Sequence, residues 1–336
     1  MLLLSFERQS KIIKIVDFMP GELVKSKIIN NYLQNHTISN YIIIEDQYIS
    51  GIPRHKIIKC SYASGFGIAE LTKSIKNLKR RNIMKHSEFK NLYADLLDME
   101  WKEKKVWELI KDSSNRDALT VAPHFIGSEY DNAKTKLMIV GRCLNGWEVD
   151  YPDCSSIENT LNSILNQPSR FYDAINEEGI PYIDDKGNEK RYYYSKSPFW
   201  RLIKKVSIEY NGEKDWNEKF VWSNLYKVSP RRGGNPSWRF IKNKIPTYIN
   251  IIKKEIETCN PSHILFITDM NWLNPYEQEN LRFGNALNIE EIQGNSYKYV
   301  VGKGQYNGAK IVVCVRPEGR PTDEMLCEIK DVFYQL

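Results

Sequence analysis

The sequence predicts an α/β protein: a three-layer α/β/α sandwich with a mostly parallel central sheet, preceded by a small basic α+β module. Two observations support this fold class. Short apolar runs alternate with amphipathic helical patterns through residues 84–336. The run at 137–140 is apolar at every position, which is typical of a parallel strand covered on both faces. We therefore expect two domains, residues 1–83 and 84–336.

The first 83 residues form the basic module. They hold 13 Lys and Arg against 6 Asp and Glu, a balance of +7, whereas the remaining residues hold 35 against 36. This excess predicts binding to a polyanion, with a protein-interaction domain as the alternative. The patterns are strand-like at 4–18 and 41–49, typical of loops at 50–55 and 61–67, and helical at 68–81.

The second domain alternates helices and strands. Ser197 is a natural helix cap and Pro198 suits the first helical position, so a helix starts there. Predicted helices cover residues 87–111, 157–165, 197–207, 239–257 and 322–333. Predicted strands cover residues 137–140, 220–222, 263–268, 297–301 and 310–315.

Composition excludes several classes of protein. The hydrophobic and charged fractions, 41% and 27%, are those of an ordinary soluble protein. No apolar run approaches the roughly 20 residues that span a bilayer. The start MLLLSF is too short for a secretory signal, so we expect a cytoplasmic chain without membrane contact. The six cysteines include no CxxC pair and the five histidines are dispersed, so no metal and no cofactor is expected.

Three polar loops follow predicted strands, at residues 141–150, 224–238 and 316–321. In open α/β sheets ligands bind beyond the carboxyl ends of the strands, so these loops predict a pocket. The middle loop lies in a stretch, 219–254, with nine Lys and Arg and no Asp or Glu. Such a stretch is suited to holding a phosphate backbone, and a solubilising surface loop is the alternative.

These residues resemble the uracil-DNA glycosylase superfamily over roughly residues 120–336. LMIVGRCLNGWE stands where the family has "VGEAPG" or "GINPG", and SPFWRLI matches a helix that opens with "FW" in the mismatch-type branch. SNLYKVSPRRGGNPSW is similar to "NVVKCRP…NR.P", and VVCVRPEGRP stands in place of "HPS" or "HPxxxLR". The resemblance implies a DNA glycosylase that acts on double-stranded DNA, and it implies nothing about protein partners.

The resemblance also implies roles for residues. Asn145 would position the attacking water, with Glu148 and Asp150 as rival general bases. Arg316 would take the place of the family's His, near the departing base. Substrate-binding residues would be Gly141, Arg142, Trp147, Phe199 and Asn224. DNA-backbone contacts would come from Lys227, Arg231, Arg232 and Arg320.

The chemistry of these side chains is consistent with such roles. The Asn224 amide offers both an acceptor and a donor, as the Watson–Crick edge of a flipped pyrimidine requires. Phe199 or Trp147 can stack on the base. Residues 318–320 would form a wedge that fills the vacated stack. Each role has a plainer alternative: a turn at Asn145, a strand-end cap at Asn224, core packing for the aromatic residues, and ordinary surface arginines.

Departures from the family pattern bear on the substrate. The first loop is two residues longer than GEAPGE and lacks its proline, Arg316 replaces His, and the four cluster cysteines of the thermostable branch are absent. A long insertion with several tyrosines follows the first loop. These features favour a modified pyrimidine over plain uracil, as in phage-defence glycosylases that remove glucosylated hydroxymethylcytosine from phage DNA. A catalytically silent nucleic-acid or nucleotide binder and an ordinary uracil or mismatch repair enzyme remain the alternatives.

Overall fold

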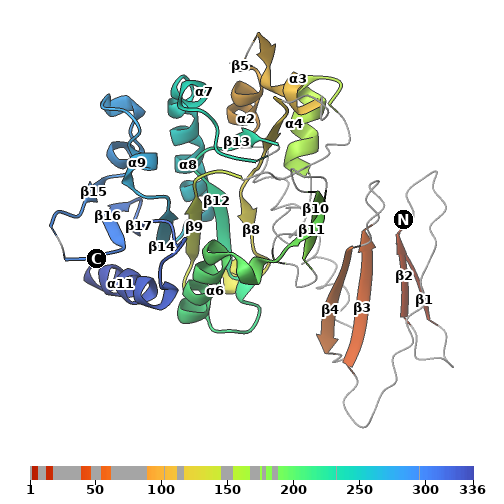
Figure 1. Cartoon of the computed structure of the whole chain (residues 1–336). Coiled ribbons are helices and arrows are strands. Elements are labelled where there is room, and N and C mark those ends of the chain that lie inside the picture. The colour runs from red at the N-terminus through yellow and green to blue at the C-terminus, as the bar shows by residue number, and fades with distance from the viewer. Residues whose placement is uncertain are drawn as a thin grey trace. The chain divides into compact units, whose positions relative to one another are not determined.

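The computed structural model divides the chain into two compact units, Met1–Asn82 and Ile83–Leu336, and each is described by itself (Figure 1). The structure describes residues 2–6, 13–17, 39–46, 54–61, 89–101, 103–111, 117–144, 154–166, 175, 179–183, 188–231, 233–294 and 296–336.

The first unit contains two antiparallel strand pairs. β1 (Leu2–Phe6) pairs with β2 (Ile13–Asp17), so the predicted strand-like run at 4–18 is divided between two strands. β3 (Ser39–Asp46) overlaps the predicted strand at 41–49 and pairs with β4 (Arg54–Ser61). The predicted helix at 68–81 lies outside the described residues.

A mixed sheet of seven strands organises the second unit, in the order β15-β16-β17-β14-β9-β12-β8. Its four central strands are parallel: β17 (Ala309–Cys314), β14 (His263–Ile267), β9 (Leu137–Gly141) and β12 (Phe220–Asn224). These are the strands predicted at 310–315, 263–268, 137–140 and 220–222. Their side chains are almost all buried apolar residues, as expected for strands covered on both faces.

The edges of the sheet are antiparallel, so the prediction of a mostly parallel sheet holds for its centre only. At one edge β8 (Phe125–Ile126) pairs with β12. At the other, β15 (Ile289–Glu291) pairs with β16 (Val300–Tyr306), which pairs with β17. The two-residue turn Asn307-Gly308 joins β16 to β17, with φ of +50° and +78°. Asn-Gly is the preferred pair for such a hairpin turn, and this signal in the sequence indicates antiparallel pairing.

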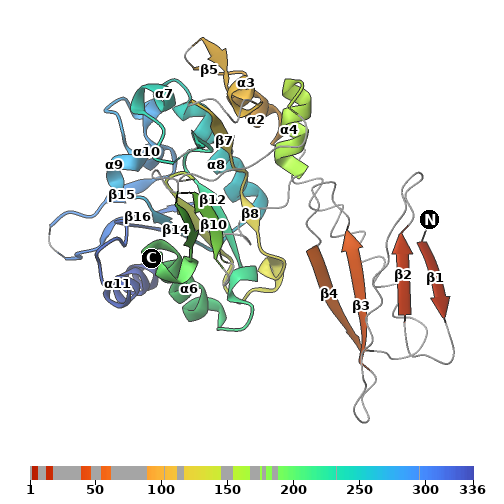
Figure 2. The same ribbon diagram turned by 45° about the vertical axis from the view of Figure 1, so that its right-hand side comes forward.

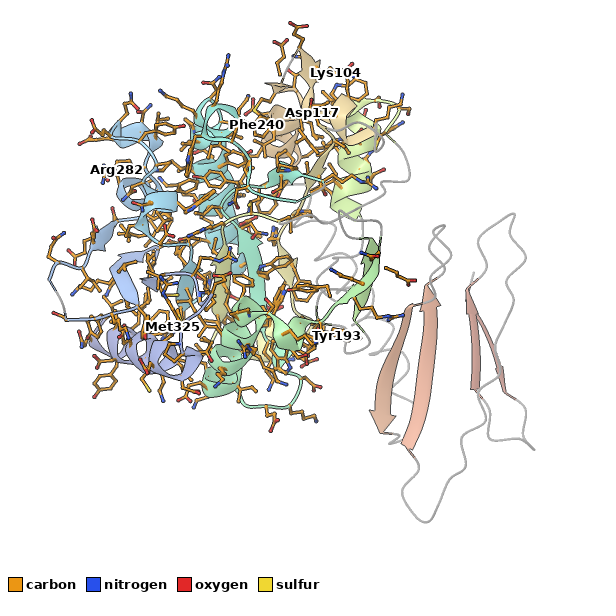
Figure 3. The ribbon with its side chains drawn as sticks, in the orientation of Figure 1. Lys104, Asp117, Tyr193, Phe240, Arg282 and Met325 are labelled. Carbon is orange, nitrogen blue, oxygen red and sulfur yellow. The ribbon has the colours of Figure 1, made fainter. Side chains whose placement is uncertain are left out.

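Helices cover both faces of the sheet. Alternate residues of β9 belong to different clusters: Met138 and Val140 pack with α8 (Ile245–Cys259), whereas Leu137 and Ile139 pack with α6 (Pro198–Asn211) and α11 (Thr322–Gln335). Figure 2 shows α6 and α11 together on one side of the sheet. The Met325 side chain of α11 belongs to the cluster on that side (Figure 3). The second unit is therefore a mixed α/β structure with helices on both faces.

Two long helices predicted from the sequence are each broken in two. Residues 87–111 form α2 (Lys90–Leu97) and α3 (Val106–Lys111), separated by the hairpin of β5 (Glu100–Trp101) and β6 (Lys104–Lys105). Glu103 adopts a φ of +66° in that hairpin, which no helix accommodates.

The second broken helix, 239–257, consists of α7 (Trp238–Lys242) and α8. Pro246 lies in the first turn of α8, where a residue without an N–H is tolerated. The break therefore falls just before the proline, although apolar residues at helical spacing continue across it.

The remaining elements are short, apart from α4 (Ile157–Asn166), which was predicted at 157–165. They are β7 (Leu119–Val121), β13 (Val228–Pro230), β10 (Ile180–Ile183), β11 (Glu189–Tyr192), α9 (Met270–Leu273), α10 (Phe283–Ala286), and the 3-10 turns Tyr130–Asn132, Tyr194–Lys196, Trp216–Glu218 and Glu279–Leu281. In the part of the chain that the structure describes, no helix has the length and apolar character needed to cross a membrane.

Candidate active site at the carboxyl edge of the sheet

The carboxyl ends of the four parallel strands lie at one edge of the sheet. Asn224, the last residue of β12, is paired in register with Gly141, the last residue of β9. Ile267 of β14 is likewise in register with Cys314 of β17. Residues that follow these strands are therefore close neighbours, as the sequence predicted for three of the four loops.

Asn224, Gly141 and Phe199 meet in a tight corner at this edge. A Cβ atom on Gly141 would lie 2.7 Å from Oδ1 of Asn224 and 3.2 Å from Cζ of Phe199. Asn224 is 3% exposed, and among the described residues none is found to hydrogen-bond with its side-chain amide. A buried amide ordinarily has partners, so this one is available to a ligand.

Phe199 is held by the start of α6. The side chain of Ser197 caps this helix by accepting a hydrogen bond from the backbone N–H of Trp200, as predicted from the sequence. The ring of Phe199 packs edge-on against the ring of Trp200, with centroids 5.2 Å apart. The guanidinium carbon of Arg316 lies 5.7 Å from the centroid of the Phe199 ring. Phe199 is half-buried, and the tip of its ring lies against Gly141 at the site.

Arg316 is bound by a carboxylate of its own loop. Its Nε donates to both carboxylate oxygens of Glu318, at 2.9 and 3.1 Å. Arg320 closes the loop, because its Nη1 donates to the backbone oxygen of Arg316 at 2.8 Å. Burial raises the pKa of Glu318, but hydrogen bonding to Arg316 and the positive charges of Arg316 and Arg142 together outweigh burial and hold that pKa below its usual range. Residues 318–320, predicted to form a wedge, form this closed turn.

Arg142 contributes a second guanidinium group to the edge. Its Nε donates to the backbone oxygen of Thr268 at 2.9 Å, its Nη2 pairs with Asp269, and its Cζ lies 4.9 Å from the ring centroid of Trp272. Burial lowers the pKa of Arg142, Asp269 opposes this shift, and the positive charge of Arg316 adds to it. The two guanidinium groups are therefore electrostatic neighbours, and each is paired with one carboxylate.

Lys227 is not available to a DNA phosphate, contrary to the prediction from the sequence. Its side chain is fully buried, and its Nζ lies 2.8 Å from Oε1 of Glu255 and 2.5 Å from Oγ of Ser223. Nδ1 of His124 lies 3.3 Å from the same Glu255 oxygen. An ammonium group without water must have a buried anion, and Glu255 of α8 supplies it.

Arg231 is also misassigned as a backbone contact, because only 7% of it is exposed. Its backbone N–H donates to the oxygen of Ala118 at 2.8 Å, which continues the pairing of β13 with β7. Arg320 is exposed and remains a candidate for contact with a phosphate.

The buried cluster of Lys227, Glu255 and His124 makes stability depend on pH. Burial lowers the pKa of His124, but the neighbouring Cys259 and Glu255 together outweigh this effect and raise the pKa to about 9. Burial raises the pKa of Glu255, but Lys227 and His124 lower it to about 2. Burial lowers the pKa of Lys227, and the charge of Glu255 opposes this shift. The Glu255 carboxylate therefore lies between protonated His124 and the Lys227 amine.

We expect a pH-dependent contribution of His124 to the free energy of unfolding. Because its folded pKa of about 9 lies above the usual 6.5, protonated His124 stabilises the fold fully below pH 6.5, and this contribution is lost as the pH rises through 9. The difference in free energy of unfolding between wild type and His124→Gln should therefore shrink from pH 6.5 to 9, measured by thermal denaturation. A difference that stays constant across this range would contradict the assignment.

Several predicted site residues lie outside the described residues. These are Asn145, Trp147, Glu148, Asp150 and Arg232. The residues that the structure brings together are Gly141, Arg142, Phe199, Asn224, Arg316 and Arg320. The role of Asn145 in positioning water is therefore supported by the sequence alone, whereas the arrangement of the other six residues is supported by the structure.

Sequence reasoning missed the fourth loop of this edge, which follows β14. Asp269 pairs with Arg142, and Trp272 packs against it. The strand at 263–268 was predicted, and the rule that loops beyond parallel strands line a pocket applies to it equally. The same rule applied to the sequence would therefore have included residues 268–274 in the predicted site.

The described residues include no group of three or more His, Cys, Asp or Glu side chains placed to hold a metal ion. A scan against models of protein families finds no match for this chain, and a search of curated proteins finds none either.

Proposed function

We propose that the chain is a DNA glycosylase that hydrolyses the N-glycosidic bond of a flipped, modified pyrimidine and leaves an abasic site, in defence against phage. The observation that carries the proposal is the nearly buried Asn224 amide at the carboxyl edge of the sheet, for which the described residues supply no hydrogen-bond partner. It is supported by the resemblance of the loops at this edge to the uracil-DNA glycosylase superfamily.

The corner around Asn224 has the chemistry that reads a base. The amide can donate to a carbonyl oxygen and accept from an N–H, which is the pattern on the Watson–Crick edge of a pyrimidine. The half-buried ring of Phe199, 5.2 Å from Trp200, offers a face on which a base can stack. Gly141 allows Asn224 and Phe199 to approach its backbone closely because it has no side chain.

Arg316 provides the charge that the reaction requires. A departing pyrimidine carries negative charge, and a guanidinium group placed beside it stabilises that charge. The proposal is supported by the position of Arg316 over the Phe199 ring, because a base that stacks on this ring would lie near the cation. The attacking water would be positioned by Asn145 and deprotonated by Asp150 or Glu148, on the loop that follows Gly141.

The experiment is incubation with three duplexes of one sequence, containing uracil, a mismatch or glucosylated hydroxymethylcytosine, followed by alkali to break abasic sites. We expect cleavage of the glucosylated duplex. Cleavage only of uracil or mismatched DNA would instead identify a repair enzyme. Retained binding without any cleavage would overturn catalysis and favour a silent nucleic-acid binder.

Gly141→Ala should reduce excision about 100-fold, because its methyl group would displace the Asn224 amide and a misplacement of about 1 Å has effects of this size. The added Cβ would lie 2.7 Å from the Asn224 oxygen. The rate is measured under single-turnover conditions, and the unfolding midpoint shows that the variant remains folded at the assay temperature. A wild-type rate in Gly141→Ala would exclude this corner as the base pocket.

A further inference from the structure

An exposed tryptophan lies close to the carboxyl edge, and base recognition by Asn224 does not explain it. Trp238 is the first residue of α7 and is 42% exposed, whereas Phe240 of the same short helix is buried (Figure 3). Tyr276 fixes the start of this helix, because its hydroxyl donates to the backbone oxygen of Trp238 at 2.8 Å. The backbone that carries the exposed ring is thus held in place.

Trp238 begins a row of flat groups in contact that leads to the candidate site. Its ring centroid lies 4.6 Å from that of Trp272, which follows β14 on α9, and the two ring planes are tilted by 42°. The guanidinium carbon of Arg142 lies 4.9 Å from the Trp272 ring. α7 and α9 lie near each other in both views (Figures 1 and 2). Besides burial, the positive charge of Arg316 lowers the pKa of Arg142, so the two guanidinium groups are near each other. The tryptophan pair and the Asn224 corner therefore belong to one edge of the sheet.

The charge around the exposed ring favours an anionic partner. Arg239 and Lys242 are exposed on the same helix as Trp238, and Lys242 lies 5.0 Å from the Tyr276 ring. The segment 219–254 that contains them has no Asp or Glu. An exposed ring with cations beside it is the arrangement by which proteins hold single strands, through base stacking and phosphate attraction.

We propose that Trp238 and Trp272 form a second nucleotide subsite that binds an unpaired base of single-stranded DNA by stacking. Its assignment to DNA next to the excised nucleotide rests on the proposed function. Trp238 is the last residue of the 224–238 loop, at its opposite end from Asn224, and base stacking explains why its ring stays exposed near basic side chains. Paired DNA has no free base face to offer, so the subsite selects unpaired strands.

The test is fluorescence anisotropy with two labelled oligonucleotides of equal length and charge, one of thymidine and one of abasic tetrahydrofuran units. Wild type should bind the thymidine strand about tenfold more tightly, in line with the usual contribution of base stacking. Trp238→Ala should abolish this preference and Trp238→Phe should retain most of it. Tyr334→Ala is the matched control: Tyr334 is 89% exposed near the end of α11, and its removal should leave the preference unchanged.

Equal binding of the two strands by wild type, or a preference that survives Trp238→Ala, would overturn the subsite. Neither strand contains a modified base, so the result is independent of excision. If these results overturn the subsite while the protein still excises bases, the proposed function stands. A tryptophan-dependent preference without excision of any base would leave the subsite standing and remove the glycosylase proposal.

Discussion

Glu255→Gln is expected to lower the free energy of unfolding of the second unit by about 3–5 kcal/mol, the usual effect of removing one partner from a buried ion pair. Glu255 is fully buried, and its carboxylate faces both Lys227 and His124. Glutamine keeps the shape of the side chain and removes its charge. Without Glu255, burial lowers the pKa of His124 again, and Lys227 remains buried without its anion. The unfolding midpoint should therefore fall by roughly 6–20 °C.

Two comparisons make this expectation specific. Glu257→Gln is the same substitution on the same helix, at an exposed position whose carboxylate lies 3.9 Å from Lys254, and it should change the free energy by less than about 0.5 kcal/mol. Lys227→Met should destabilise less than Glu255→Gln, because His124 still neutralises the remaining carboxylate. Equal unfolding midpoints for Glu255→Gln and Glu257→Gln would contradict the buried cluster.

Asn224→Asp is expected to reduce the rate of base excision at least about 100-fold, the scale on which loss of one positioned donor acts. Aspartate has nearly the same shape, but it loses the N–H₂ donor and places a negative charge beside the base. Affinity for DNA should change little, since phosphate contacts supply most of it. The rate is measured under single-turnover conditions and the affinity by anisotropy.

Asn250→Asp supplies the matched control for that variant. It is the same chemical change at an exposed position on α8, and it should leave both rate and affinity unchanged. If Asn224→Asp excised bases as fast as this control, Asn224 would have no role in recognising the substrate.

The centre of the fold could be predicted because its signals are local. Each of the four parallel strands is a short apolar run, and Ser197 with Pro198 marks the start of α6. The antiparallel edge was missed although Asn307-Gly308 indicates a hairpin. The break near Glu103 could also be read from the sequence, because Met99 continues the apolar helical pattern but Glu103 occupies its next position.

The candidate site was predicted in part. Asn224, Gly141, Phe199 and Arg316 meet because parallel strands end at a common edge, which the order of motifs indicates. Such reasoning cannot predict ion pairs across the core, since no spacing in the sequence links Lys227 to Glu255. One indication was present: Glu255 falls within the buried stripe of α8, and a charge in such a stripe requires a buried partner.

The release of free base from DNA tests the central claim most directly. Duplex DNA containing glucosylated hydroxymethylcytosine is incubated with the protein, and the small-molecule fraction is analysed by mass spectrometry while abasic sites are counted in the polymer. The proposed function predicts free glucosylated base in amounts equal to the abasic sites, with both lost in Asn224→Asp while DNA binding persists. Tight binding of this DNA by wild type, with no free base and no abasic site, would contradict it.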